Sequence, residues 1–237
     1  MAKFLTFSFD DGTKQDFRLT EIFGKYGIKS TFNINSGLFG KMDYLDCDGQ
    51  RVEHFKINES DVRQLYAGQE LAVHTVTHPS LPGLSEEDIV YQVNHDKKAL
   101  EEIWGQKIIG MAYPCGGINH DERVMEIIKR RTDIRYARTI TSTYSFGFPE
   151  NFLEWNPTCH TTDEKLFELL EEFLKLSDEE DRLFYIWGHA FNFDASNQWD
   201  RITDFCREIS TIKEIELAVN SEVYFYAEKK AQSVAEA

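Results

Sequence analysis

Four short apolar runs in this chain each end in polar residues that are capable of chemistry. The runs and their ends are Phe4–Phe9 with Asp10-Asp11-Gly12, Glu70–Val73 with His74 to His78, Ile108–Ala112 with Tyr113 to Gly117, and Leu183–Trp187 with Gly188-His189. In an α/β barrel, reactive groups lie where parallel strands finish and loops begin. The pattern therefore predicts a barrel with a site at the carboxyl ends of its strands.

Strand-like and helix-like segments alternate along the whole chain, which favours a mostly parallel sheet. Expected strands are Lys3–Phe9, Ser30–Ile34, Glu70–Val73, Lys107–Ala112, Ile134–Arg138 and Arg182–Trp187. Expected helices are Phe17–Tyr26, Glu59–Ala67, Ser85–Trp104, Asp121–Arg131, Asp163–Leu176 and Gln198–Ile209, with a final pair of elements near Ile215–Val219 and Val223–Lys229. Residues 36–58 are expected to form a loop with a small hairpin at Asp48-Gly49. We predict an α/β fold in a single domain, residues 1–230: a distorted (β/α) barrel of about seven parallel strands, followed by a flexible tail over 231–237.

The charge of the chain argues against two kinds of partner. Its 237 residues carry a net charge of −15, whereas nucleic-acid and anionic-membrane surfaces need basic patches.

No run of about 18 apolar residues is present to cross a membrane, and no secretion signal begins the chain, so we expect a cytoplasmic protein. Its oligomeric state is not predictable. Four scattered cysteines fit reduced thiols better than a disulfide framework: Cys47, Cys115, Cys159 and Cys206.

Asp10 and Asp11 place two neighbouring carboxylates at the end of the first run. Two carboxylates this close in a dry site repel each other unless a cation lies near them. One is then free to bind a metal while the other accepts a proton. The alternative is a pair that caps the following turn, because Asp-Gly is itself a turn signal.

His74 and His78 are four residues apart on a segment whose threonines and proline argue against a regular helix. Two imidazoles and one carboxylate form a recurring zinc set with an open position for water. Two unrelated loop histidines are the alternative. His189 also follows a strand and suits a general acid, since the pKa of histidine lies near neutrality; the alternative is a core histidine bonded to a carbonyl.

The segment Tyr113-Pro114-Cys115-Gly116-Gly117 predicts a rigid turn at a strand end. Backbone N–H groups in such a turn are able to point at a developing oxyanion. A plain strand-to-helix turn is the alternative. A nucleophilic thiol at Cys115 is less well supported, because metal-activated water is a simpler source of attack.

Taken together, these motifs resemble the polysaccharide deacetylase family, the carbohydrate esterases of family four. The family motif T-F-D-D-G is matched by Ser8 to Gly12, and H-[ST]-x-x-H is matched by His74 to His78. The motif R-x-P-[YF]-G is matched in part by Met111 to Gly116, and the L-x-H motif by Trp187-Gly188-His189. The matches extend from residue 8 to residue 189.

The resemblance implies metal-dependent removal of N-acetyl groups, with O-acetyl groups as a further option, from an acetylated sugar or oligosaccharide by metal-activated water. It assigns Asp10 as general base, His189 as general acid, and Asp11, His74 and His78 as ligands of a divalent metal. Zn²⁺ is the expected ion, with Co²⁺, Ni²⁺, Mn²⁺ and Fe²⁺ as further options. Residues expected to contact the oxyanion or the substrate are Tyr113, Pro114, Cys115, Trp155 and Trp187.

This chain departs from the family pattern in three places. Met111 is expected to replace the arginine that steadies the catalytic aspartate, and Cys115 replaces an aromatic residue. The carboxylate that orients the acid histidine is not evident, with Asp163 and Asp194 as candidates. Two other functions therefore stay open: hydrolysis of a C–N bond in a cyclic amide or ureide, and a catalytically weakened sugar-binding domain.

Overall fold

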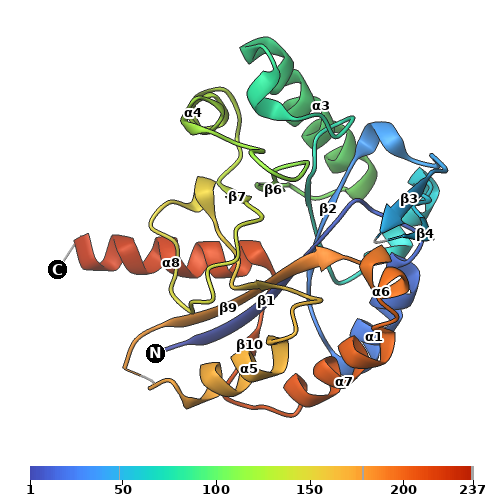
Figure 1. Ribbon diagram of the computed structural model, residues 1–237. Helices are drawn as coiled ribbons and strands as arrows, with labels where there is room; N and C mark the ends of the chain where they lie inside the picture. The colour runs from blue at the N-terminus through green and yellow to red at the C-terminus, as the bar shows by residue number, and fades with distance from the viewer. Residues whose placement is uncertain (48, 178, 236–237) are drawn as a thin grey trace.

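The computed structural model describes residues 1–47, 49–177 and 179–235. Within these ranges the main sheet has the strand order β7-β6-β5-β2-β1-β9-β8, with β10 added beside β1, and every strand pair in it is parallel. The strands are β1 Lys3–Asp10, β2 Thr31–Ile34, β5 Glu70–Val73, β6 Gly110–Ala112, β7 Tyr136–Arg138, β8 Cys159–His160, β9 Arg182–His189 and β10 Glu216–Leu217. The sheet is curled (Figure 1), and the predicted barrel of about seven parallel strands is confirmed.

The two edges of the curled sheet are joined through residues 155–160. Trp155 exchanges backbone hydrogen bonds with β7, donating to the Ala137 carbonyl at 3.0 Å. Three residues later, Thr158 donates to the Tyr185 carbonyl of β9 at 2.7 Å. This segment therefore belongs to the barrel wall.

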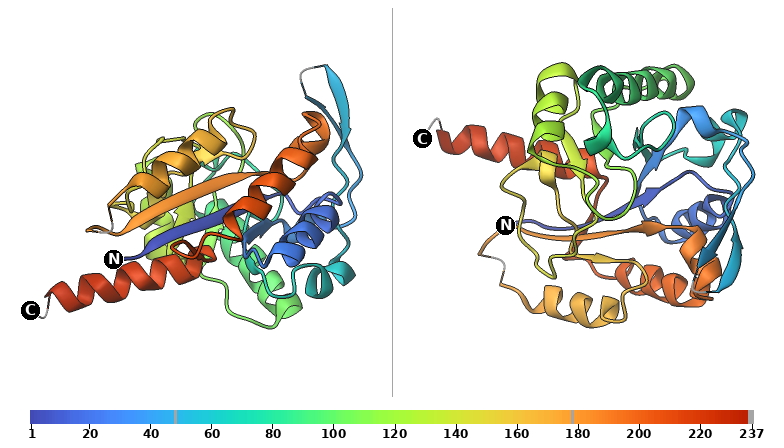
Figure 2. Two further views of the ribbon diagram at one scale, coloured as in Figure 1. Left: turned by 90° about the horizontal axis from the view of Figure 1, so that it is seen from below. Right: turned by 45° about the horizontal axis from the view of Figure 1, so that its top comes forward.

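The helices lie around the sheet and over one of its ends (Figures 1 and 2). They are α1 Asp16–Tyr26, α2 Val62–Leu65, α3 Glu86–Trp104, α4 Glu122–Arg131, α5 Leu166–Lys175, α6 Phe191–Ala195, α7 Trp199–Ile209 and α8 Asn220–Ala235, with short 3₁₀ turns η1 Ser36–Leu38, η2 Glu59–Asp61, η3 Leu81–Gly83 and η4 Phe152–Glu154. Capping follows the sequence signals: Ser85 accepts a hydrogen bond from the Asp88 N–H at the start of α3, and Gly27 ends α1 in the left-handed region at φ 67°. None of the described helices is long and apolar enough to cross a membrane.

The predicted hairpin is present, whereas the predicted tail is in part helical. A hairpin does lie in the predicted loop, with β3 Tyr44–Cys47 paired antiparallel to β4 Gln50–Glu53; Asp48, in its predicted turn, lies outside the described residues. Helix α8 continues through Ala235, so residues 231–235 are helical where a tail was expected, and residues 236–237 are not described.

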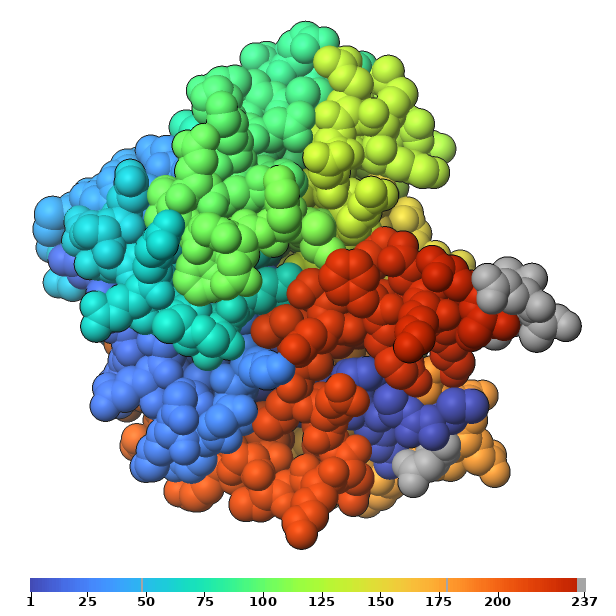
Figure 3. All heavy atoms as spheres, turned by 180° about the vertical axis from the view of Figure 1, so that it is seen from behind, coloured from blue at the N-terminus to red at the C-terminus, as the bar shows by residue number. Residues whose placement is uncertain are grey.

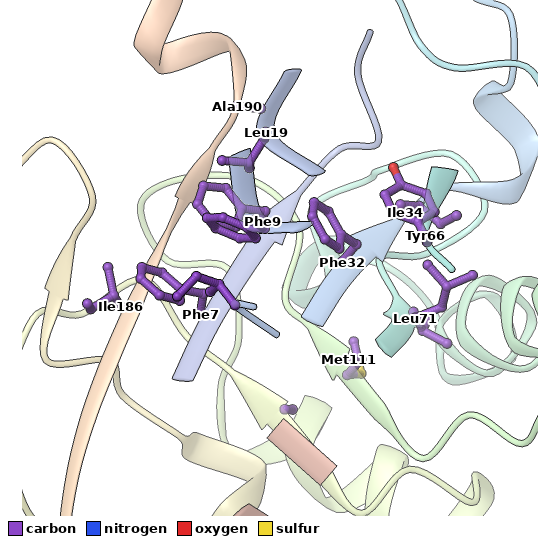
Figure 4. Close-up of a cluster of buried hydrophobic side chains, with 14 of the residues drawn as sticks. Phe7, Phe9, Leu19, Phe32, Ile34, Tyr66, Leu71, Met111, Ile186 and Ala190 are labelled. Carbon is purple, nitrogen blue, oxygen red and sulfur yellow. The ribbon is translucent and has the colours of Figure 1, made fainter. Parts of the chain in front are cut away.

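Alternate residues of each strand face opposite sides of the sheet, and the two sides differ in chemistry. On the helix side, aromatic and aliphatic side chains pack together, Phe7, Phe9 and Phe32 among them (Figure 4). On the barrel side, β1 presents Thr6 and Ser8 before Asp10. The sheet therefore separates an apolar layer under the helices from a barrel interior that contains these polar side chains and a second cluster of buried aromatic residues.

Helix α8 closes the end of the barrel that lies away from Asp10. Its first residue, Asn220, accepts a hydrogen bond from the Thr6 hydroxyl at 2.9 Å and donates to the Tyr185 hydroxyl at 2.6 Å. Figure 3, a view from behind, shows α8 spread across that surface. The open end of the barrel is therefore the one formed by the carboxyl ends of the strands.

Strand register places the predicted site residues at that open end. Asp10 is the register partner of His189 on β9 and of Asn33 on β2. On the far side of the barrel, Ala112 of β6 is the partner of Arg138 on β7. Register partners in a sheet point to the same face, so these side chains converge on one space.

Candidate functional site

A cavity of about 150 Å³ lies at the carboxyl ends of the strands. Its lining contains residues from all four motifs that the sequence singled out: Asp10, Asp11, His74, His78, Tyr113, Cys115, Gly116, Ile140, Trp187 and His189. A cavity of this size holds a small acyl group rather than a whole sugar. Any carbohydrate ring would then lie outside it, above the strand ends.

Asp10 is buried and held on both of its oxygens. The guanidinium of Arg138 donates to Oδ2, and the Asn33 amide donates to Oδ1 at 2.8 Å. Burial by itself would raise the pKa of this carboxyl, but the charge of Arg138 and the nearby imidazoles lower it below its ordinary value. Asp10 is therefore an anion at neutral pH with a fixed orientation, as a general base requires.

The prediction that Met111 stands in place of the family arginine is wrong, and Arg138 supplies the guanidinium beside Asp10. Counting back two residues from Pro114, as R-x-P requires, leads to Ala112 and not to Met111. Met111 packs in the apolar layer on the helix side of the sheet (Figure 4). Ala112 faces the barrel, where its small side chain leaves room for its register partner Arg138 to reach Asp10.

Arg138 is itself completely buried and firmly held. It donates to the Thr139 carbonyl at 2.8 Å and to the Ser8 hydroxyl at 3.2 Å, and its guanidinium lies 4.5 Å from the centre of the Trp187 ring. The arginine that steadies the aspartate is thus present, on the strand next to the expected one.

Asp11 projects from the same strand end in a left-handed conformation at φ 82°. Its Oδ1 accepts from Lys56 Nζ at 2.9 Å, and its Oδ2 lies 3.0 Å from His54 Nε2. Burial would raise the pKa of this carboxyl, but the bond to His54 and the charge of Lys56 hold it well below its usual range. Each carboxylate oxygen keeps a second lone pair free for another ligand.

His74 and His78 face Asp11 across the cavity. One ligand atom from each of the three residues lies within 4.8 Å of the others, and His78 Nε2 is 3.7 Å from Asp11 Oδ1. His74 Nδ1 lies 2.9 Å from the Ala112 carbonyl, so it carries the hydrogen and leaves the Nε2 lone pair available. Burial lowers the pKa of His74 to about 4 and also lowers that of His78, which keeps both imidazoles neutral, as metal ligands must be.

The donor set fits a divalent ion. Two imidazole nitrogens and a carboxylate oxygen, with room for a further ligand, are the set that zinc uses in catalytic sites. Tetrahedral zinc ligands lie about 3.3 Å apart, close to the 3.7 Å between His78 and Asp11. His78 and Cys115 also have left-handed backbones, at φ 58° and 71°, and such conformations of non-glycine residues cluster at functional sites.

His189 lies on the other side of Asp10, with its Nε2 3.9 Å from Asp10 Oδ2. Its Nδ1 is 3.1 Å from Asn192 Oδ1, so Nδ1 carries a hydrogen and Nε2 faces the cavity. The predicted partners, Asp163 and Asp194, are engaged elsewhere, by the Tyr144 hydroxyl and the Trp199 indole. Asn192 is therefore the residue that orients His189.

The structure brings Tyr113, Cys115 and Trp187 to the cavity, but not every residue predicted for the substrate side. Pro114 joins two lining residues without lining the cavity itself. Trp155 is 1% exposed and packs in the barrel interior with Tyr136 and Tyr185. The Trp155 side chain is therefore part of the core and does not line the cavity.

Sequence reasoning missed several residues that contact Asp10, Asp11 or His189. Arg138 had a usable signal, since it ends a predicted strand as the other site residues do. His54 and Lys56 follow the hairpin, and Asn192 lies in the segment after β9. These three carry no strand-end pattern, so only the folded chain places them.

The fold and the site define a class of protein: an α/β barrel with two carboxylates and three histidines, including a candidate metal-binding triad, at the carboxyl ends of its strands. A family model described as polysaccharide deacetylase matches residues 1–132, more than half of the 237 residues. The chain belongs to the polysaccharide deacetylase family.

The individual proteins that match this chain have low sequence identity to it or match only part of it. The peptidoglycan-N-acetylmuramic acid deacetylase PdaC of Bacillus subtilis (strain 168) is 33% identical over 75 residues, which is 32% of this chain and 16% of that protein. The deacetylase PplD of Streptococcus pyogenes, solved with acetate, has a TM-score of 0.52 at 22% identity, over 63% of this chain and 61% of its own.

The Xyl-CE4 domain of a multidomain xylanase from the hindgut metagenome of Trinervitermes trinervoides has a TM-score of 0.60 at 18% identity. That similarity covers 98% of this chain and 92% of the solved chain. At this level of identity the two solved structures support the fold.

Proposed function

We propose that this chain is a metal-dependent hydrolase that removes acetyl groups from an acetylated carbohydrate. One observation carries the proposal: the buried anion Asp10 and the imidazole His189 line the same cavity as the Asp11–His74–His78 group and lie directly beside it. Family membership supports acetylated sugars as the substrate class. Both N-acetyl and O-acetyl groups fit the size of the cavity.

Asp11, His74 and His78 would hold the ion, most simply Zn²⁺. When bound, a divalent ion supplies Lewis acidity toward the acetyl carbonyl and lowers the pKa of water. Asp10 is oriented to take the proton of the attacking water, because Arg138 and Asn33 fix both of its oxygens. The anion needs no rearrangement before it accepts that proton.

His189 is placed to return a proton to the leaving nitrogen or oxygen of the sugar. Asn192 fixes the ring so that Nε2 points at the reacting space. On the opposite side, the Cys115 N–H points toward His78 Nε2 at 3.4 Å. An oxyanion that formed beside the metal group would be near this N–H, and backbone N–H groups are donors of the kind that stabilise an oxyanion.

The argument for a weakened, sugar-binding domain was the missing arginine. Arg138 now supplies the guanidinium beside Asp10, so that argument no longer has a basis. Hydrolysis of a cyclic amide or ureide shares the same groups. A substrate panel separates it from deacetylation.

The test is acetate release from acetylated chito-oligosaccharides and acetylated xylan, set against small ureides. Protein stripped with EDTA should lose activity and regain it with Zn²⁺, Co²⁺ or Mn²⁺. Asp10→Asn should lower the rate by at least about a hundredfold, the usual share of a general base, while metal still binds. Asp133→Asn, at a side chain that is 84% exposed, should change neither. A folded protein that binds no metal, or an active Asp10→Asn variant, would contradict the proposal.

A further inference from the structure

Lys56 is a buried cation beside the proposed metal group. Its residue exposure is 4%, and its ammonium has three oxygen acceptors: the Asp11 carbonyl at 2.8 Å, Asp11 Oδ1 at 2.9 Å and Asn35 Oδ1 at 3.4 Å. An ammonium has three hydrogens to donate and no lone pair. Lys56 is therefore fully engaged as a charged donor and is not itself a metal ligand.

The charges around the cavity are already balanced without an ion. Lys56 is paired with Asp11, and Arg138 is paired with Asp10. A divalent ion at the Asp11–His74–His78 group would therefore add two positive charges to neutral surroundings. Because charges interact strongly at buried positions, the repulsion from Lys56 opposes binding of the ion.

Lys56 also connects the two halves of the metal group. Asn35, which accepts from Lys56, donates its amide to the His74 carbonyl at 2.6 Å and to the Thr75 carbonyl at 2.9 Å. The N–H of His74 is held separately, by Asp96 Oδ2 at 3.1 Å. One ammonium therefore links the carboxylate ligand to the peptide that carries the first imidazole ligand.

We propose that Lys56 is a positioning residue that supplies the positive charge at Asp11 when no metal is bound, keeping the ligands arranged while weakening the grip of the site on a divalent ion. The inference rests on the proposed metal-dependent function. The Lys56 ammonium would stabilise the site when no ion is bound and would allow a bound ion to exchange. Removing the charge should reverse both properties: an unpaired buried carboxylate destabilises the fold, and an ion then relieves it.

The experiment uses the full chain with Lys56→Met, and Lys56→Gln as a second variant whose amide still donates without charge. Zn²⁺ and Co²⁺ affinities are measured by competition with a chelating dye, and melting temperatures with and without EDTA. Both variants should bind metal at least about tenfold more tightly than the unmodified chain, because they remove the repulsion between a buried positive charge and the ion. In EDTA they should melt lower, and added Zn²⁺ should raise their melting temperature more.

Lys97→Met is the matched control. Lys97 is 9% exposed and pairs with Glu101 at 3.0 Å on α3, without touching the metal group, so its loss should lower stability in EDTA and leave metal affinity unchanged. Variants of Lys56 that bind metal no more tightly than the unmodified chain would overturn the inference. If neither the unmodified chain nor the Lys56 variants bind metal, the proposed metal site itself fails, which is a distinguishable result.

Discussion

Replacing Arg138 with methionine tests the electrostatic design of the site most directly. Methionine keeps much of the length and apolar bulk of arginine but removes the charge and its donors. Asp10 would remain buried, and among the residues that the structure describes the Asn33 amide would be the side chain that still donates a hydrogen bond to it. Leaving one member of a buried ion pair without its partner typically destabilises a protein by about 3–5 kcal/mol.

The loss should depend on pH, and its sign follows from Asp10. In the unmodified chain the pKa of Asp10 is below its ordinary value of 3.8, so this carboxylate stabilises the fold above that pH and ceases to do so as the pH falls. Without Arg138, burial dominates and the pKa rises above the ordinary value. The variant then loses stability as the pH rises, so its deficit is larger at about pH 8 than at about pH 5.

The assay is urea unfolding in EDTA at both pH values, followed by acetate release. Arg131→Met is the control, because Arg131 makes an ion pair with Glu86 in which both side chains are 34% exposed, and such pairs contribute little. Deacetylation by Arg138→Met should be strongly reduced near neutrality, where Asp10 would be partly protonated. A deficit that is the same at both pH values, or no larger than that of the control, would refute this reasoning.

A relocation variant sharpens the test. Arg138→Ala combined with Ala112→Arg moves the guanidinium to the position that the family motif specifies, on the adjacent strand and the same face. We expect the pair to recover part of the stability and activity that Arg138→Ala loses. Met111→Arg in the same background should recover nothing, because Met111 faces the apolar layer.

Two further outcomes follow from other buried groups. Burial raises the pKa of Asp16 to about 8 from 3.8, so the folded state holds a proton there that the unfolded chain has lost, and this group makes stability fall as the pH rises from about 4 to 8. Asp16→Asn, which can still accept from the Tyr66 hydroxyl, should flatten that part of the pH–stability curve; an unchanged curve in urea titrations would count against it. Asn192→Ala should slow acetate release about tenfold or more without altering metal affinity, because Asn192 touches His189 and not the metal group, whereas Asn192→Asp should retain the rate. An Asn192→Ala variant with full kcat would show that His189 needs no such partner.

The sequence alone determined the elements and the end of the barrel at which chemistry gathers. Apolar runs that stop at Asp10, His74 and His189 predict strands with polar ends, because buried parallel strands are rich in apolar residues. Ser85 and Gly27 marked helix ends through capping, which is a local property. These features survive in the structure because short-range chemistry dictates them.

The tertiary structure decided the partners. Which arginine meets Asp10 depends on strand register and on a small side chain at Ala112, and neither is visible without knowing that β6 and β7 are neighbours. Lys56 reaches Asp11 from 45 residues away, and Trp155 enters the barrel wall because its backbone completes the curled sheet. Long-range contacts of this kind come from closure of the whole barrel, so the charge balance of the site belongs to the fold rather than to any motif.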